Sequence, residues 1–288
     1  MNEIQQLDAQ IRKEVALKEY KGPDRVIYGE DKKNELDEAR KFAPSFNVAS
    51  GLATLDSCID GFRKGQLIIV SGPPKQGKTA FCQTLTESFI KQGKKCLWFS
   101  YELSFEELFT KFPMNIMDFY LPNYMETGNL KWIEDRIIES KQKFGTEIVF
   151  IDHLDFLRDL EILKGVSLNL SAYVGGIVQK VKQMAIKHEM VIFLMSHIRK
   201  NKWTTNELPS SEELRDSGQI AQLADIVLMI IRRRADKTGE EIYERNEAFL
   251  GVMENRHNGK TKRIAIKLEG KRYEESDLIP NKKIDEWK

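Results

Sequence analysis

The stretch "QLIIVSGPPKQGKTAF" (residues 66–81) decides the fold of this chain. Its apolar run at 67–70 predicts a buried strand, and residues 72–79 match the phosphate-binding pattern G-x-x-x-x-G-K-[ST] without a mismatch. In such a loop the glycines let backbone N–H groups face phosphates, the lysine supplies a cation, and the hydroxyl ligates Mg²⁺. The sequence therefore predicts a loop that binds ATP with Mg²⁺, made of Gly72, Pro73, Pro74, Lys75, Gln76, Gly77, Lys78, Thr79 and Ala80.

Two acidic residues are candidates for the remaining chemistry. The run "EIVFID" (147–152) ends in Asp152, which we expect to join Thr79 as a metal ligand, and "CLWFSYE" (96–102) ends in Glu102, which we expect to activate the attacking water. Both follow predicted strands, whose carboxyl ends form the ligand crevice of α/β sheets. Each also has a structural explanation, because aspartate commonly ends a strand and Glu102 lies just before a predicted helix.

Short apolar runs alternate with amphipathic segments along the rest of the chain. We expect strands at 66–72, 96–102, 147–152, 190–196 and 224–232, and helices at 78–92, from 104, at 130–143 and at 171–188. This alternation predicts an α/β domain with a largely parallel central sheet. The segments "EAFLGVMENR" and "TKRIAIKLEG" predict a C-terminal β-hairpin that turns at Asn258-Gly259. The domain should span residues 46–288.

The first 45 residues have a different character. Ile4, Leu7, Ile11 and Val15 recur at steps of three and four, which predicts an amphipathic helix over residues 2–20. The charged segment that follows, with prolines near both ends, is typical of a solvated linker. The apolar stripe suits docking on another subunit, or alternatively packing on the chain's own surface.

Composition limits the function classes. The net charge is +1, so a nucleic-acid contact would have to be local. Cys58, Cys82 and Cys96 form no C-x-x-C pair, which favours a reducing compartment over a disulfide framework or a zinc site. No apolar run approaches 18 residues and no secretory signal is visible. These features predict a soluble intracellular protein without a membrane partner.

Three stretches resemble the motor domain of DnaB-type replicative helicases. They are "VASGLATLDSCIDGFRKGQLIIVSGPPKQGKTAF" (48–81), "FSYELS" (99–104) and "LRDSGQIAQLADIVLMIIR" (214–232). The resemblance implies a RecA-like P-loop ATPase core, a homo-oligomeric ring that we expect to be a hexamer, and 5′-to-3′ translocation on single-stranded DNA that unwinds duplex. It also implies a primase or loader partner and a place in the cytoplasm of a bacterial or phage-infected cell. About 45 residues precede the motor, too few for the family's N-terminal collar domain, and the predicted first helix is similar to the family's linker helix.

The resemblance also assigns roles to residues. It makes Glu102 the catalytic base, Arg256 an arginine finger acting on a neighbour's nucleotide, and His197 the sensor of the γ-phosphate. The DNA-contacting candidates are Arg199, Lys200, Arg215, Asp216 and Gly218, with Lys202 and Trp203 beside them and a second channel loop at 158–170. A solvated charged loop is the alternative for the individual cations.

Two residues depart from the family pattern, and the second of these departures, with the missing collar domain, leaves a non-motor function open. His197 replaces the usual glutamine, and Glu254 replaces the cation of the K-x-R pattern that ends in Arg256. The expected catalytic set is Lys78, Thr79, Glu102, Asp152, His197 and Arg256. Two alternatives are a RecA/RadA-like recombinase ATPase and a helicase-like loader or regulator without unwinding activity.

Overall fold

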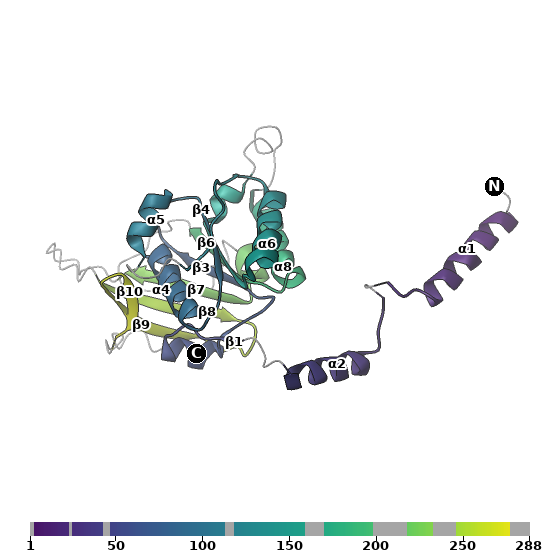
Figure 1. Cartoon of the computed structure of the whole chain (residues 1–288), viewed down its shortest axis with the longest axis horizontal. Coiled ribbons are helices and arrows are strands. Elements are labelled where there is room, and N and C mark those ends of the chain that lie inside the picture. The colour runs from purple at the N-terminus through teal and green to yellow at the C-terminus, as the bar shows by residue number, and fades with distance from the viewer. Residues whose placement is uncertain are drawn as a thin grey trace. The chain divides into compact units, whose positions relative to one another are not determined.

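The chain forms two compact units, Met1–Phe46 and Asn47–Lys288. The computed structural model describes residues 3–22, 25–42, 47–112, 118–158, 170–197, 218–232 and 246–276 (Figure 1). Within those ranges, no helix is long and apolar enough to cross a membrane.

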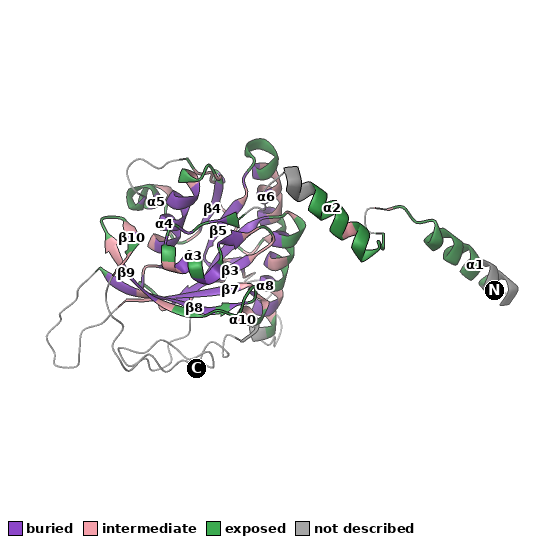
Figure 2. Cartoon of the chain, turned by 90° about the horizontal axis from the view of Figure 1, so that it is seen from below, coloured by how far each residue is buried: buried purple, intermediate pink, exposed green. Residues whose placement is uncertain are grey.

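The N-terminal unit contains two helices, α1 (Glu3–Lys18) and α2 (Gly29–Phe42). The predicted first helix is confirmed, and its stripe residues Ile11 and Val15 are half exposed (Figure 2). The charged segment predicted as a solvated linker contains the helix α2. Residues 30–42 lack glycine and proline and are rich in good helix formers, with acidic residues in the first turn and a Lys32–Glu35 ion pair one turn apart.

The second unit is built on an eight-stranded sheet in the order β10-β9-β8-β7-β3-β6-β5-β4. Its strands are β3 (Leu67–Gly72), β4 (Cys96–Ser100), β5 (Ile148–Asp152), β6 (Val191–His197), β7 (Ile226–Arg232), β8 (Glu247–Asn255), β9 (Lys262–Glu269) and β10 (Arg272–Glu275). Strands β4, β5, β6, β3 and β7 are parallel, whereas β8, β9 and β10 join antiparallel. The predicted parallel sheet and C-terminal hairpin are therefore confirmed.

Helices cover both faces of the sheet (Figure 1). They are α3 (Ala53–Ile59), α4 (Lys78–Lys91), α5 (Phe105–Lys111), α6 (Leu130–Phe144), α8 (Leu170–Lys187) and α10 (Gly218–Leu223), with a 3₁₀ turn η1 (Leu154–Leu157) and a small antiparallel pair β1 (Asn47–Val48) and β2 (Phe62–Arg63). Ser104 caps α5 through a reciprocal bond with Glu107, and Asn129 caps α6. These caps explain where both predicted helices begin.

Alternate residues of the parallel strands enter two apolar layers. On one face, Leu67, Ile69 and Val149 pack with α6 and α8. On the other, the rings of Trp98 and Phe193 each stack on Phe150 at 4.7 Å between centroids. Figure 2 shows the strands buried between these layers. Burial on both faces fixes the strand register, because a slip of one residue would exchange the layers.

Candidate nucleotide-binding site

The predicted phosphate loop connects β3 to α4 at the carboxyl edge of the sheet. The Lys78 side chain folds back over it, and Nζ donates to the carbonyl oxygens of Gly72 and Pro73, both at 3.0 Å. Lys78 is only 5% exposed, and this burial lowers its pKa to about 8 against the opposing effect of Asp152 and Glu102. The loop thus holds a cation at the centre of the expected phosphate cradle.

Two glycines let residues of β7 and β10 approach the loop closely. Gly72 has φ +147°, and a Cβ there would lie 2.3 Å from the carbonyl oxygen of Ile230 in β7. Gly77 has φ +94°, and a Cβ there would lie 2.3 Å from the hydroxyl of Tyr273 in β10. The positive φ disfavours a side chain at both positions, and at Gly72 the Ile230 backbone also leaves no room for one. The glycines of the pattern are therefore structural as well as phosphate-facing.

Thr79 and Asp152 meet as the sequence predicted. The Thr79 hydroxyl donates to Oδ2 of Asp152 at 2.8 Å, which joins the first turn of α4 to the end of β5. Asp152 is 1% exposed, and burial raises its pKa to about 6 although the bond from Thr79 opposes that shift. A hydroxyl and a carboxylate side by side suit Mg²⁺, which prefers oxygen ligands and keeps part of its water shell.

Glu102 and His197 also lie at this edge of the sheet. His197 ends β6, pairs in register with Gly72, and brings Nδ1 to 2.9 Å from Lys78 Nζ. Glu102 is exposed in the loop after β4, close enough to affect the pKa of Asp152. Burial and the nearby Lys78 ammonium lower the pKa of His197, so its ring is neutral at pH 7. The structure thus brings Lys78, Thr79, Glu102, Asp152 and His197 together.

His153 is a member of this cluster that the sequence reasoning missed. It is 8% exposed, and its ring meets that of His197 edge to face at 4.4 Å between centroids. The signal was present, because His153 directly follows strand-ending Asp152 and parallel β5 and β6 are neighbours. Residues after adjacent parallel strands converge, so the two histidines had to be near each other.

Arg256 lies away from the nucleotide loop of its own chain. Its backbone N–H donates to the carbonyl oxygen of Asp225 at 2.9 Å, and its side chain is exposed. Pairing of Asn255 with Ile226, and of Ile226 with Ile68, puts this turn at the amino edge of the central strands. The length of β3 separates that edge from the loop by about 16 Å at the usual rise per residue. The structure does not bring Arg256 into the cluster.

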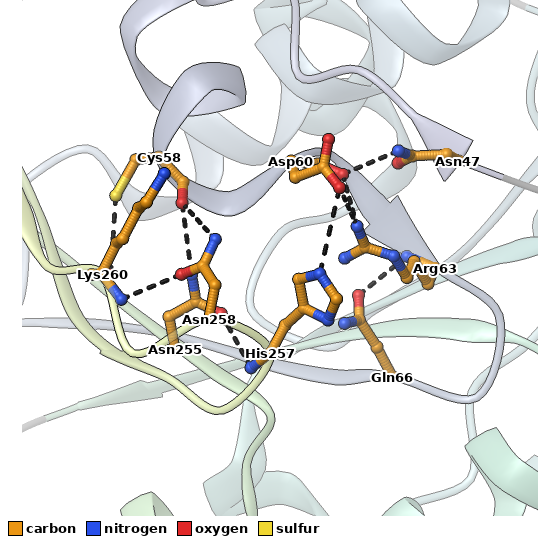
Figure 3. A network of polar contacts seen from close by, with 9 residues as sticks. All are labelled: Asn47, Cys58, Asp60, Arg63, Gln66, Asn255, His257, Asn258 and Lys260. Carbon is orange, nitrogen blue, oxygen red and sulfur yellow. Dashed lines mark hydrogen bonds and ion pairs between the residues drawn. The ribbon is translucent and has the colours of Figure 1, made fainter.

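The turn that carries Arg256 is pinned to the end of α3 (Figure 3). Nδ2 of Asn258 donates to the Cys58 carbonyl oxygen at 2.9 Å, while its Oδ1 accepts from Asn255 Nδ2 at 2.7 Å and from the Lys260 N–H at 2.9 Å. The predicted Asn258-Gly259 turn is confirmed, with Gly259 at φ +70°. A side-chain network therefore fixes the hairpin in place.

The predicted DNA-contacting residues are only partly described. Gly218 is the first residue of α10. Arg199, Lys200, Lys202, Trp203, Arg215 and Asp216 lie outside the described residues, as does the loop at 159–169. Asp225, in the same family-like stretch, has a structural role: its Oδ2 accepts from the Leu67 N–H at 2.7 Å and from Lys182 Nζ at 2.5 Å.

The sheet order, the phosphate loop and the strand-ending acid define an ATPase-type α/β core. Two solved structures share this fold. One is an ATPase domain, with a TM-score of 0.69 at 18% identity over 87% of this chain and 100% of that one. The other is a DnaB-like replicative helicase solved for its interactions with primase, with a TM-score of 0.66 at 18% identity over 94% of this chain and 72% of that one. The expected RecA-like fold is confirmed.

The chain belongs to the family described as "DnaB-like helicase C terminal domain", whose model matches residues 47–135 and 114–275. A "Probable replicative DNA helicase" of Trieres chinensis is 26% identical over 253 residues, covering 77% of this chain and 55% of that protein. Replicative DNA helicase DnaB of Mycoplasma genitalium is 27% identical over 252 residues, covering 75% of this chain and 53% of that protein. The chain spans about half the length of these relatives. The suspected family is confirmed.

Proposed function

We propose that this chain is the ATP-hydrolysing motor of a replicative DNA helicase, which moves along single-stranded DNA and unwinds duplex. The observation that carries the proposal is the Thr79–Asp152 hydrogen bond beside the buried Lys78, in a chain of the DnaB-like family. Lys78 binds the β- and γ-phosphates, and Thr79 and Asp152 hold Mg²⁺. Glu102, exposed and facing the same edge, orients the attacking water.

Arg256 acts in a neighbouring subunit. It sits at the sheet edge opposite its own phosphate loop, so it can complete only the site of another copy. An arginine supplied in this way stabilises the charge that develops on the transferred phosphate. The proposal therefore includes a homo-oligomeric ring, a hexamer by family resemblance, in which each active site lies between two subunits.

The remaining parts of the proposal follow from the family. Residues 46–288 form the motor, and residues 1–45 form an arm whose apolar stripe docks on the adjacent subunit. Arg199, Lys200, Arg215, Asp216 and Gly218 contact the DNA backbone, which suits a motor that must not stop at a preferred base. ATP and Mg²⁺ are the cofactors, a primase or loader is a further partner, and the protein works in the cytoplasm of a bacterial or phage-infected cell.

The test is ATP hydrolysis with and without single-stranded DNA, followed by strand displacement on a forked duplex. DNA should stimulate turnover, and Lys78→Ala should abolish it while the circular dichroism spectrum stays unchanged. Turnover that ignores DNA would favour the loader or regulator, and strand exchange without displacement would favour the recombinase.

Mixing experiments test the shared site. Arg256→Ala protein titrated into wild type should lower the ATPase rate below the sum of the separate proteins, because mixed rings contain incomplete sites. Lys260→Ala is the matched control, since Lys260 is an exposed cation on the same hairpin. Rates that simply add for Arg256→Ala would rule out its role in a neighbour's site.

A further inference from the structure

A second group of potential metal ligands lies beside the expected Mg²⁺ position. Glu102, His153 and His197 each offer one ligand atom, and these three atoms lie within 4.8 Å of one another. The residues come from the ends of β4, β5 and β6, three neighbouring parallel strands. The rigid sheet therefore holds the two histidines in place, while the exposed Glu102 side chain can adjust.

The chemistry of this group differs from that of the Mg²⁺ position. Mg²⁺ takes oxygen ligands, whereas two imidazoles and one glutamate form a known zinc ligand set that leaves a fourth position open. Imidazole nitrogen also binds Co²⁺ and other first-row transition metals. The donor set therefore selects against Mg²⁺ and in favour of ions such as Zn²⁺.

His153 has the outer carboxylate that metal-binding histidines usually have. Its Nδ1 lies 3.4 Å from Oδ2 of Asp155 and accepts the Asp155 N–H at 3.2 Å. Because Nδ1 accepts this N–H, the neutral ring carries its proton on Nε2. Metal binding through Nε2 moves the proton to Nδ1, where it donates to the Asp155 carboxylate in place of the bond from the Asp155 N–H. Asp155 is held in turn by an ion pair with Arg158.

We propose that Glu102, His153 and His197 bind a transition-metal ion of the Zn²⁺ class in the nucleotide-free protein, at a position distinct from the Mg²⁺ ligands Thr79 and Asp152. Ligand atoms around a tetrahedral zinc are about 3.4 Å apart, given bonds near 2.1 Å. The present separation of up to 4.8 Å requires a shift of roughly one ångström. Rotation of the exposed Glu102 side chain can bring its carboxylate closer to the two imidazoles.

Lys78 weakens the binding of this metal ion. Its ammonium repels a dication, and its 2.9 Å contact with Nδ1 of His197 favours the tautomer in which Nε2 carries the proton. Metal binding through Nε2 breaks this contact, after which Lys78 retains its bonds to the Gly72 and Pro73 carbonyl oxygens. Removal of the lysine should therefore tighten metal binding, which a nonspecific surface site would not predict.

Cobalt absorption tests the site without any assay of activity. The full-length protein, free of nucleotide, is titrated with Co²⁺ and followed by its visible d–d bands, and Zn²⁺ is then added to displace it. We expect one equivalent of Co²⁺ to bind and Zn²⁺ to abolish the bands. His153→Asn and His197→Gln should each lose them, Asp155→Asn should weaken binding about tenfold, and Lys78→Ala should tighten it several-fold.

The chain offers a matched control. It has four histidines, and His257→Gln, remote on the C-terminal hairpin, should bind Co²⁺ like wild type. Circular dichroism shows whether each variant is folded. Bands that persist in both His153→Asn and His197→Gln, or that vanish in folded His257→Gln, would overturn the proposal, as would the absence of bands in wild type.

One consequence rests on the proposed function. A bound Zn²⁺ occupies Glu102 and His197, so it should inhibit ATP hydrolysis at concentrations that saturate the cobalt site. A protein that binds Co²⁺ as expected but does not hydrolyse ATP would contradict the proposed function and leave the metal site standing. ATP hydrolysis by a protein that shows no cobalt bands would contradict the metal site and leave the proposed function standing.

Discussion

Lys78 and His197 are in direct contact, with 2.9 Å between Nζ and Nδ1. The contact follows from the sheet, because β3 and β6 are parallel neighbours in which Gly72 pairs with His197. It joins the phosphate loop to the strand that leads into the predicted DNA-contacting segment. Lys78 and the end of β6 are therefore linked by one hydrogen bond.

Replacement of His197 tests this contact. In His197→Gln the amide oxygen can still accept from Lys78, so we expect a kcat for ATP hydrolysis within about tenfold of wild type. His197→Leu removes the polar group, and we expect a loss of about 100-fold, the usual effect of deleting one hydrogen-bonding group near the transferred phosphate. Steady-state kinetics with saturating Mg²⁺ check both values. Equal losses in the two variants would show that size at this position matters and hydrogen bonding does not.

Asp152→Asn should stabilise the nucleotide-free protein at alkaline pH. The pKa of Asp152 is raised to about 6 in the folded state from 3.8, so the folded state binds more protons between these values and loses stability as pH rises through them. Two pKa units correspond to about 3 kcal/mol. We expect the variant to gain about 2 to 4 kcal/mol at pH 8 and about 1 kcal/mol at pH 4.5. Guanidinium unfolding without Mg²⁺ measures both.

Thr79→Val should lower the free energy of unfolding, whereas Asp152→Asn should raise it, so Thr79→Val serves as the control. It removes the hydroxyl that donates to the Asp152 carboxylate, so the buried charge loses its partner. We expect a loss of about 1 to 3 kcal/mol at pH 8 that shrinks as pH falls and Asp152 becomes protonated. A gain from Asp152→Asn that does not change with pH would mean that the charge is not its cause.

Gly72→Ala should damage the fold, beyond any effect on nucleotide binding. The added Cβ would lie 2.3 Å from the Ile230 carbonyl oxygen, and the backbone there has φ +147°. Strain and overpacking together should cost about 2 to 5 kcal/mol of unfolding free energy. The control is Gly176→Ala in α8, where a Cβ meets nothing within 4 Å. The higher helix propensity of alanine should raise the free energy of unfolding of this variant by about 0.5 to 1 kcal/mol. A neutral Gly72→Ala would contradict the close approach of β7.

The sequence predicts the sheet well because its signals are local. Buried runs of apolar residues identify the strands, and the glycines and lysine at 72–79 identify the loop. It does not reveal that Gly77 faces Tyr273, a contact between residues nearly 200 positions apart that depends on where β10 packs. The family-like stretch at 214–232 contains both predicted DNA-contacting residues and a structural residue. The structural residue is Asp225, which accepts hydrogen bonds from the start of β3 and from Lys182 in α8. Spacing alone does not separate such structural residues from functional ones.

Asn258→Ala tests whether the network in Figure 3 positions the hairpin that carries Arg256. Asn258 donates to the Cys58 carbonyl oxygen and accepts from Asn255 and Lys260, so its loss leaves several polar groups without this partner. We expect a cost of about 1 to 3 kcal/mol in unfolding free energy, with a fall in DNA-stimulated ATPase larger than the loss of folded protein explains. His257→Ala, whose exposed ring lies 3.9 Å from Asp60, should cost less than about 0.5 kcal/mol. If both variants behave alike in unfolding and turnover, the Asn258 network does not position Arg256.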